Sequence, residues 1–148
     1  MKASTWFVFA NRTDAAFYAD GSDHEFHFLS RFSNPKGNRL ESELDSDRSG
    51  SSFSGSNGGV FRHALDRHHH RHQVVAQRFA GRIARTLEGE GLKNNFSKLV
   101  LVAEPRFMGL LRKALPGTVK KKVICEVKRE YKKNSNAELR DQVLRAIA

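Results

Sequence analysis

The sequence predicts an α/β fold in which a mixed sheet of about five strands is flanked by helices. Three observations support this prediction. Strand-like segments fill the first 33 residues, helix-like and strand-like segments alternate after residue 60, and one apolar run lacks any polar alternation. Strands followed by alternating helices and strands are typical of a sheet with antiparallel and parallel pairs. The chain has 148 residues, so we predict a single domain over residues 1–148.

The first three predicted strands form an antiparallel meander. They are expected at residues 5–10, 15–19 and 25–32, and a turn sequence separates each from the next. In the third strand apolar and polar side chains alternate. The alternation predicts that Phe26, Phe28 and Phe32 share one face, with His27 and Arg31 on the other.

A long segment over about residues 34–60 is predicted to be a mobile loop inside the domain. Residues 46–60 contain six Ser and four Gly. Such a composition cannot bury enough apolar surface to offset the entropy lost on ordering. A structureless segment of this length is often functional.

The longest predicted helix spans residues 66–88. Its apolar stripe, which should cover one face of the sheet, consists of Val75, Phe79, Ile83 and Leu87. Gly89 and Gly91 are the expected helix terminators, because glycine adopts the left-handed conformation that ends many helices.

The last part of the chain alternates strands and helices, so the predicted order is β-β-β-loop-α-β-α-β-α. Residues 99–103 are all apolar, which is typical of a strand buried on both faces. A short helix begins at Pro105 and ends before Pro116. Residues 119–127 are the predicted fifth strand, with Val123 and Cys125 on one face. The last helix is expected to begin at Ser135 or Asn136 and to run to Ile147.

The positive charge is concentrated in the last third of the chain. The formal net charge is +10, and residues 98–148 carry 13 Lys and Arg against five Asp and Glu. Such an excess indicates a polyanionic partner, and we expect structured RNA or the ribosome. A solvated Lys-rich surface and an anionic membrane are the alternatives. The residues expected to contact phosphate are Arg62, His63, Arg67, Arg71, Arg78, Lys120, Lys121 and Lys122.

A histidine cluster at the start of the long helix is the one candidate metal site. His68 and His72 would lie one helical turn apart and could share a metal ion, but no third ligand is apparent. Cys125 is distant in sequence and is expected to be a small core residue. We therefore expect neither a metal nor another cofactor.

Two further patterns point only weakly to catalysis. Gly58-Gly59 could bring backbone N–H groups close to phosphate, but the Lys of a phosphate-binding loop is missing. The acidic residues lie in predicted turns and in the loop, where nothing holds them in place. Asn11 stands at the end of the first strand, where a metal-dependent nuclease would need a carboxylate.

Several segments closely resemble the bacterial family of host attachment proteins, which are described as required for attachment to host cells. They are the run from Ser46 to Phe53, His63-Ala64-Leu65, Arg78-Phe79-Ala80, the block from Leu99 to Arg112, and Ile124 to Lys128. The resemblance covers nearly the whole chain. Its most specific part is Pro105-Arg106-Phe107, which follows the buried strand.

That family is distantly similar to the middle domain of archaeal and eukaryotic peptide release factors, and this resemblance implies the same element order. In release factors a Gly-Gly-Gln loop promotes hydrolysis of peptidyl-tRNA. The nearest match here is Gly58-Gly59-Val60, and valine cannot supply the side-chain amide of glutamine. The resemblance therefore implies a fold more firmly than an activity.

Three functions follow as hypotheses. The first is a binding module for structured RNA, on the ribosome. The second is an enzyme, a peptidyl-tRNA hydrolase that positions water with the backbone of Gly58 and Gly59. The third is a protein–protein adaptor in attachment to host cells. Neither a signal peptide nor an apolar run of about 20 residues is evident, so we expect a cytoplasmic location.

Overall fold

The computed structural model describes residues 4–20, 26–37, 58–131 and 136–147, with only the backbone for residues 58–65, 68, 136–139 and 147. Five strands form one sheet in the order β3-β2-β1-β4-β5. Their bounds are Thr5–Ala10 (β1), Asp14–Asp20 (β2), Phe26–Ser33 (β3), Lys98–Ala103 (β4) and Val123–Lys128 (β5). β1, β2 and β3 pair antiparallel, whereas β1, β4 and β5 run parallel. The predicted mixed sheet and its α/β class are confirmed.

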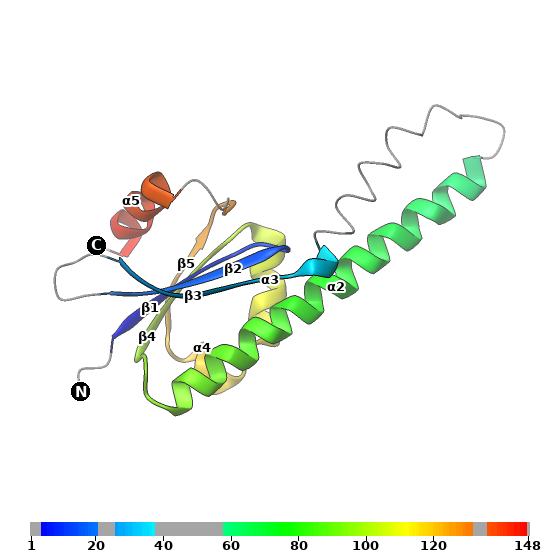
Figure 1. Ribbon diagram of the computed structural model, residues 1–148. Helices are drawn as coiled ribbons and strands as arrows, with labels where there is room; N and C mark the ends of the chain where they lie inside the picture. Colours follow the sequence, from blue (N-terminus) through cyan, green and yellow to red (C-terminus); the bar gives the residue numbers. More distant parts are fainter. Residues whose placement is uncertain (1–3, 21–25, 38–57, 132–135, 148) are drawn as a thin grey trace.

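Helices cover both faces of this sheet (Figure 1). Their bounds are Gly58–Leu92 (α2), Pro105–Ala114 (α3), Gly117–Lys120 (α4) and Asn136–Ile147 (α5). The first three pack on one face around a core that includes Phe17, Phe79 and Phe107. Val143 of α5 joins a second core on the other face with Phe7, Phe9 and Tyr131.

The interior strand β4, between β1 and β5, is buried on both faces, as its uninterrupted apolar sequence predicts. Leu99 and Leu101 point into the core under α2, and Val100 and Val102 point into the core under α5. A strand between two parallel neighbours and two helical layers has no solvent-facing side, which explains its lack of polar alternation.

The face assignment predicted for β3 is wrong, because a β-bulge interrupts the strand. Phe17 pairs with Ser30 and Tyr18 pairs with Phe28, so Leu29 is an extra residue. An extra residue shifts every later side chain to the opposite face. Phe26 therefore packs against Phe7 in one core, whereas Phe32 packs against Phe17 and Phe79 in the other. Phe28 is 58% exposed.

A second irregularity corrects the prediction for the fifth strand. Val119 belongs to α4, a single helical turn, and β5 begins only at Val123. The register shifts beside β4, where Leu99 pairs with Val123 and Val100 pairs with Cys125. As a result Val123 and Cys125 face opposite cores instead of sharing a face.

The long helix α2 extends the predicted helix at both ends. It begins at Gly58, inside the segment predicted to be a loop, and residues 35–37 at the other end of that segment are also helical. The rest of the predicted loop, residues 38–57, lies outside the described residues. The helix continues through Gly89 and Gly91, so neither glycine is the terminator.

The end of α2 is instead formed by Asn94, which has a φ of 58°. Its N–H donates to the carbonyl of Gly91 at 3.0 Å, and the N–H of Asn95 donates to the carbonyl of Glu90 at 3.1 Å. These two bonds form a Schellman motif, in which asparagine takes the left-handed position that glycine usually occupies.

Candidate nucleic-acid interface

One half of α2 is anchored in the core and the other half extends beyond the sheet (Figure 1). From Ala76 onward the helix contributes a buried stripe that includes Phe79, Ile83 and Leu87. Phe79 contacts the rings of Phe32 and Phe107, with centroid distances of 5.6 and 6.3 Å. This packing fixes the direction of the helix, so side chains on its outer face have defined relative positions.

The outer face of α2 carries a row of arginines, which we call the arginine stripe. Its members are Arg67, Arg71, Arg78, Arg82 and Arg85, all of which are exposed. Successive members are four, seven, four and three residues apart, and each of these spacings places the next arginine on the same side of the helix. At about 100° per residue they fall within an arc of about 60°, and at about 1.5 Å per residue they extend over about 27 Å.

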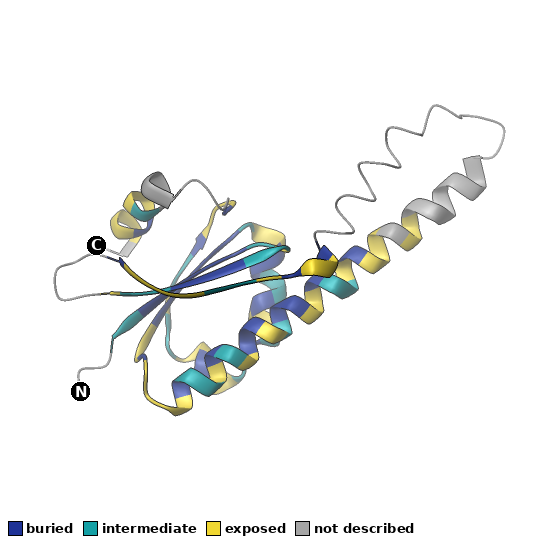
Figure 2. Cartoon of the chain, viewed as in Figure 1, coloured by how far each residue is buried: buried dark blue, intermediate teal, exposed yellow. Residues whose placement is uncertain are grey.

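Buried and exposed residues occupy different sides of α2 (Figure 2), and helical geometry places the arginine stripe opposite the buried stripe. Two residues of the buried stripe, Ile83 and Leu87, are each turned from Arg85 by about 160° around the helix. The nearest acidic residues of α2 in sequence, Asp66 and Glu88, are turned away from Arg67 and Arg85 by about 60 to 100°. No acidic residue of α2 therefore lies on the same arc as the arginine stripe.

Arg82 differs from the other members because it also contacts the sheet. Its guanidinium carbon lies 4.3 Å from the ring centroid of Phe32, and Nη1 donates to the carbonyl of Ser33 at 3.3 Å. A guanidinium held over an aromatic face contributes about 0.5–1 kcal/mol at an exposed site. Arg82 therefore helps to hold α2 against the edge strand β3.

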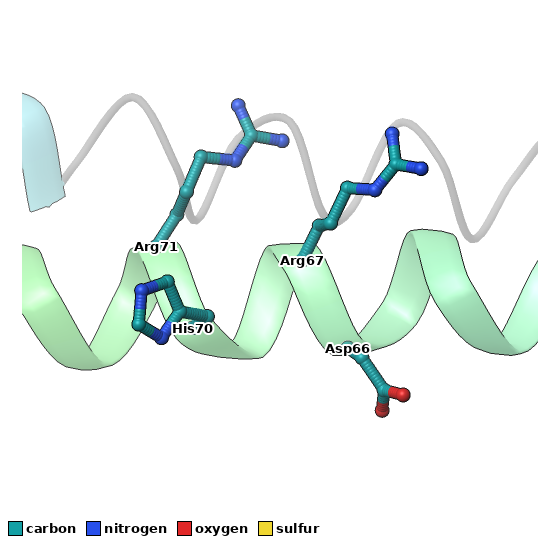
Figure 3. Close-up of a pocket in the computed structure, with 4 residues that line it drawn as sticks. All are labelled: Asp66, Arg67, His70 and Arg71. Atoms are coloured by element: carbon teal, nitrogen blue, oxygen red, sulfur yellow. The ribbon is translucent and has the colours of Figure 1, made fainter.

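A hollow of about 630 Å³ lies at the outer half of α2, and its described lining residues are Asp66, Arg67, His70 and Arg71. Arg67 and Arg71 project from the same side of the helix, one turn apart, whereas Asp66 points to another side (Figure 3). Two parallel guanidinium groups can each donate several hydrogen bonds to phosphate oxygens.

The lysines that the sequence grouped with these arginines lie at the other end of α2. Lys122 donates from Nζ to the carbonyl of Gly91 at 3.4 Å, and this Nζ lies 5.2 Å from the ring centroid of Phe96. Lys121 and Lys122 line a second hollow of about 350 Å³. The helical rise puts Gly91 about 36 Å from Arg67, so the predicted residues form two separate basic regions.

Lys120 and Lys121 are exposed and belong to the second basic region. Arg62 and His63 lie on α2 before the stripe, and the structure describes only their backbone. The predicted set therefore reduces, among described side chains, to Arg67, Arg71 and Arg78 on one helix face. Arg85 lies on the same face of the helix. Its spacing of seven residues from Arg78 could be read from the sequence.

The structure gives no support to the predicted metal site at His68 and His72. His72 is only 8% exposed, at the start of the buried stripe of α2, and the side chain of His68 lies outside the described residues. Among the side chains that the structure describes, no three His, Cys, Asp or Glu residues gather as metal ligands.

Gly58 and Gly59 lie in the first turn of α2 and not in a loop. The hydrolase hypothesis needs their backbone N–H groups in an open loop that can approach a substrate. The structure therefore places the two glycines at the start of a helix instead of in the predicted loop.

Asn11, at the carboxyl end of β1, has a structural role that the sequence did not reveal. Its Oδ1 accepts hydrogen bonds from the N–H groups of Thr13 and Asp14 at 2.8 and 2.7 Å. Its Nδ2 donates to the carbonyl of Tyr131 at 2.9 Å. Tyr131 is 1% exposed, and its hydroxyl accepts a bond from Nη2 of Arg31 at 3.0 Å. Asn11 therefore ties the β1–β2 turn to the segment before α5.

The most specific block of the family resemblance also has structural roles. Glu104 caps α3, where its carboxylate accepts hydrogen bonds from the N–H groups of Phe107 and Arg106 at 2.7 and 3.2 Å. Pro105 occupies the first helical turn, which suits its fixed φ. Phe107 is fully buried beneath α2.

The described helices include no candidate for a membrane span. None of them combines the length and the apolar character that crossing a bilayer demands.

Comparison with known proteins places the chain in a family. A solved structure of an archaeal translation termination factor, aRF1, is similar over 96% of this chain with 8% sequence identity and a TM-score of 0.47. The chain spans only 37% of that protein. No curated protein matches the sequence. The family model described as "Protein required for attachment to host cells" matches residues 6–143. The chain therefore belongs to the host attachment family.

Proposed function

We propose that the arginine stripe of α2 binds the phosphate backbone of folded RNA, such as tRNA or the RNA of the ribosome. The observation that carries the proposal is the row of exposed arginines on one arc of an anchored helix, an arc that holds no acidic residue of α2. Arg67, Arg71, Arg78 and Arg85 supply the contacts, and Arg62 and His63, nearer the start of the same helix, stay predicted contacts.

Charge and geometry support this proposal together. The chain has a net charge of +10, which attracts any polyanion. The stripe adds direction, because its guanidinium groups follow one line of about 27 Å and can meet successive phosphates. Lys120 and Lys121 would form a second, separate contact region, whereas the ammonium group of Lys122 already contacts Gly91 and Phe96.

The cellular role named by the family is attachment to host cells. In this proposal the role is indirect, because an RNA-binding module affects attachment through translation or its regulation. The hydrolase alternative rests on Gly58 and Gly59, which begin α2, and no described side chain beside them supplies the missing amide of glutamine.

The test removes four charges from the stripe. The variant Arg67→Gln/Arg71→Gln/Arg78→Gln/Arg85→Gln keeps good helix formers at all positions. Its binding to tRNA and to 70S ribosomes is measured by filter binding at about 50 and 200 mM salt. The dependence of log K on log salt should become shallower by about 0.7–0.9 for each lost contact, or by about 3–4 in total.

A charge-matched control separates the stripe from net charge alone. The control replaces four exposed cations on other elements with Gln: Arg106, Lys113, Lys128 and Arg129. It should bind tRNA with a salt dependence close to that of the unmodified protein. A control that loses as much affinity as the stripe variant, or an unmodified protein with no salt-dependent micromolar binding, refutes the proposal.

A further inference from the structure

The outer edge of β3 is an open sheet edge with an apolar centre. β3 is the last strand of the sheet, and within the described residues no strand pairs with it on the side away from β2. Residues 27–30, at its centre, are all exposed. Two of them are large and apolar, since Phe28 is 58% exposed and Leu29 is 42% exposed. A sheet edge of this kind is a template for another extended chain.

Backbone groups of β3 point toward that open side. The N–H of Asn34 donates to the carbonyl of Thr13 at 2.7 Å, on the side of β2. Backbone groups in an antiparallel ladder alternate in direction, so those of Ser33 and Arg31 point away from β2. The carbonyl of Ser33 accordingly accepts a hydrogen bond from Nη1 of Arg82 at 3.3 Å. An extended chain beside β3 can therefore bond to the backbone of Arg31.

A guanidinium group lies at each end of this edge. At the Ser33 end it belongs to Arg82 of α2, and at the Phe26 end it belongs to Arg140 of α5. Nη2 of Arg140 donates to the carbonyl of Phe26 at 3.2 Å, and its Cζ lies 5.3 Å from the centroid of the same ring. Phe26 and Ser33 are the first and last residues of β3, about 20 Å apart along the strand. A guanidinium group has five N–H donors, so each arginine keeps donors for a carboxylate.

The acidic residues nearest to this edge in the sheet lie behind it. β3 itself contains no acidic residue. Asp14 lies on β2 opposite Ser33, and its carboxylate accepts hydrogen bonds from the hydroxyls of Thr13 and Ser33. Asp20 lies on β2 opposite Phe26. Because neighbouring strands are about 4.8 Å apart, both acids are one strand further from an added chain than the two guanidinium groups that touch β3.

We propose that the outer edge of β3 binds an acidic, extended segment of a partner protein by strand addition. In this mode of recognition main-chain hydrogen bonds supply affinity and side-chain contacts supply specificity. Apolar residues at the centre of the segment pack on Phe28 and Leu29. Carboxylates near its two ends pair with Arg82 and Arg140.

Charge favours this occupant over a second copy of the chain. Antiparallel pairing of two β3 strands puts the Phe26 end of one copy beside the Ser33 end of the other. Arg140 of one copy then lies close to Arg82 of the other, and like charges at an interface disfavour association. RNA matches the two arginines, but its phosphate backbone supplies neither strand hydrogen bonds nor an apolar centre.

The test uses a capped octapeptide with two glutamates at each end and alternating valine and threonine between them. Isothermal titration calorimetry should give a Kd of about 10–500 μM, as for a weak, transient contact. The same peptide with lysine in place of glutamate should bind at least about tenfold more weakly. With the acidic peptide bound, the backbone N–H of Arg31 should exchange with solvent more slowly.

Two variants and a matched control locate the binding surface. Leu29→Glu should weaken binding of the acidic peptide by about tenfold, because it puts a negative charge at the apolar centre. Its unfolding midpoint should stay close to that of the unmodified protein, since Leu29 is exposed. Arg82→Gln/Arg140→Gln should remove most of the preference for glutamate over lysine. The control is Ile124→Glu, which should leave binding unchanged: Ile124 is 52% exposed, at the register shift of the opposite edge strand β5.

Four results would overturn the inference. The first is no binding of the acidic peptide at about 1 mM. The second is equal binding of the acidic and lysine peptides, or equal losses in Leu29→Glu and Ile124→Glu. The third is a loss in the four-arginine variant of the stripe with none in Leu29→Glu, which would place the peptide on the stripe as a polyanion. The fourth is self-association of the unmodified protein that Leu29→Glu abolishes, which would assign the edge to a second copy.

The inference stands or fails separately from RNA binding. Leu29 lies outside the arginine stripe, so Leu29→Glu should bind tRNA as the unmodified protein does. The four-arginine variant of the stripe retains Arg82 and should bind the acidic peptide as before.

Discussion

Replacing Asn11 with Asp tests the link between the two ends of the domain. The carboxylate can still accept hydrogen bonds from the N–H groups of Thr13 and Asp14, but it has no donor for the carbonyl of Tyr131. A single chemical change therefore removes one bond of the network and keeps the others. It also puts a carboxylate where metal-dependent nucleases would need one.

The magnitude follows from the burial of Tyr131. A buried acceptor that loses its donor costs about 1–3 kcal/mol. The new carboxylate at position 11 also repels the carbonyl oxygen of Tyr131. We therefore expect Asn11→Asp to lower the free energy of unfolding by about 2 kcal/mol. For a chain of this size that corresponds to a fall of about 4–8 °C in the unfolding midpoint.

The assay is thermal and urea unfolding followed by circular dichroism. Asn95→Ala is the control, because it also removes an Nδ2 donor, to Glu90, but at an exposed site. The control should stay within about 0.5 kcal/mol of the unmodified protein. If Asn11→Asp is equally stable, Asn11 does not hold the Tyr131 segment in place and the reasoning fails.

Two further predictions concern burial. Burial raises the pKa of Tyr131, so its contribution to stability is complete below about pH 10 and is lost as the pH rises through the higher folded-state value. Urea unfolding between about pH 8 and 11 should show this loss in the unmodified protein and a weaker one in Tyr131→Phe; parallel curves would contradict it. Phe79→Ala should lower the free energy of unfolding by about 3–5 kcal/mol, because Phe79 joins α2 to Phe32 and Phe107. A loss below about 1 kcal/mol would mean that the core closes around the gap.

The sequence predicted the central elements of the fold closely. β1 was found at its predicted bounds, and β4 begins one residue earlier than predicted. Both strands carry strong local signals, because aromatic and β-branched residues are concentrated in them. The short helix after β4 was predicted from Pro105, and the structure adds the cap supplied by Glu104. Local conformational preferences and the pattern of burial agree at these positions, so the sequence was sufficient to predict these elements.

The candidate site was only partly predictable. The exposed arginines of α2 were visible as basic residues, and their spacing was enough to place them on one face. The structure separates them from Lys120, Lys121 and Lys122, because net charge along the sequence does not measure distance along a helix. The position of His72 could not be predicted either, since its burial depends on how α2 is rotated against the sheet.

The sequence alone determined the class of the fold, the order of its elements and the excess of positive charge. Only the tertiary structure decided which face each side chain occupies after the bulges at Leu29 and beside Val123. It also decided which polar groups meet, as when Asn11 and Tyr131 bond across 120 positions of sequence. The physical reason is that periodicity and propensity act between near neighbours, whereas register and long-range hydrogen bonds depend on how complete layers pack together.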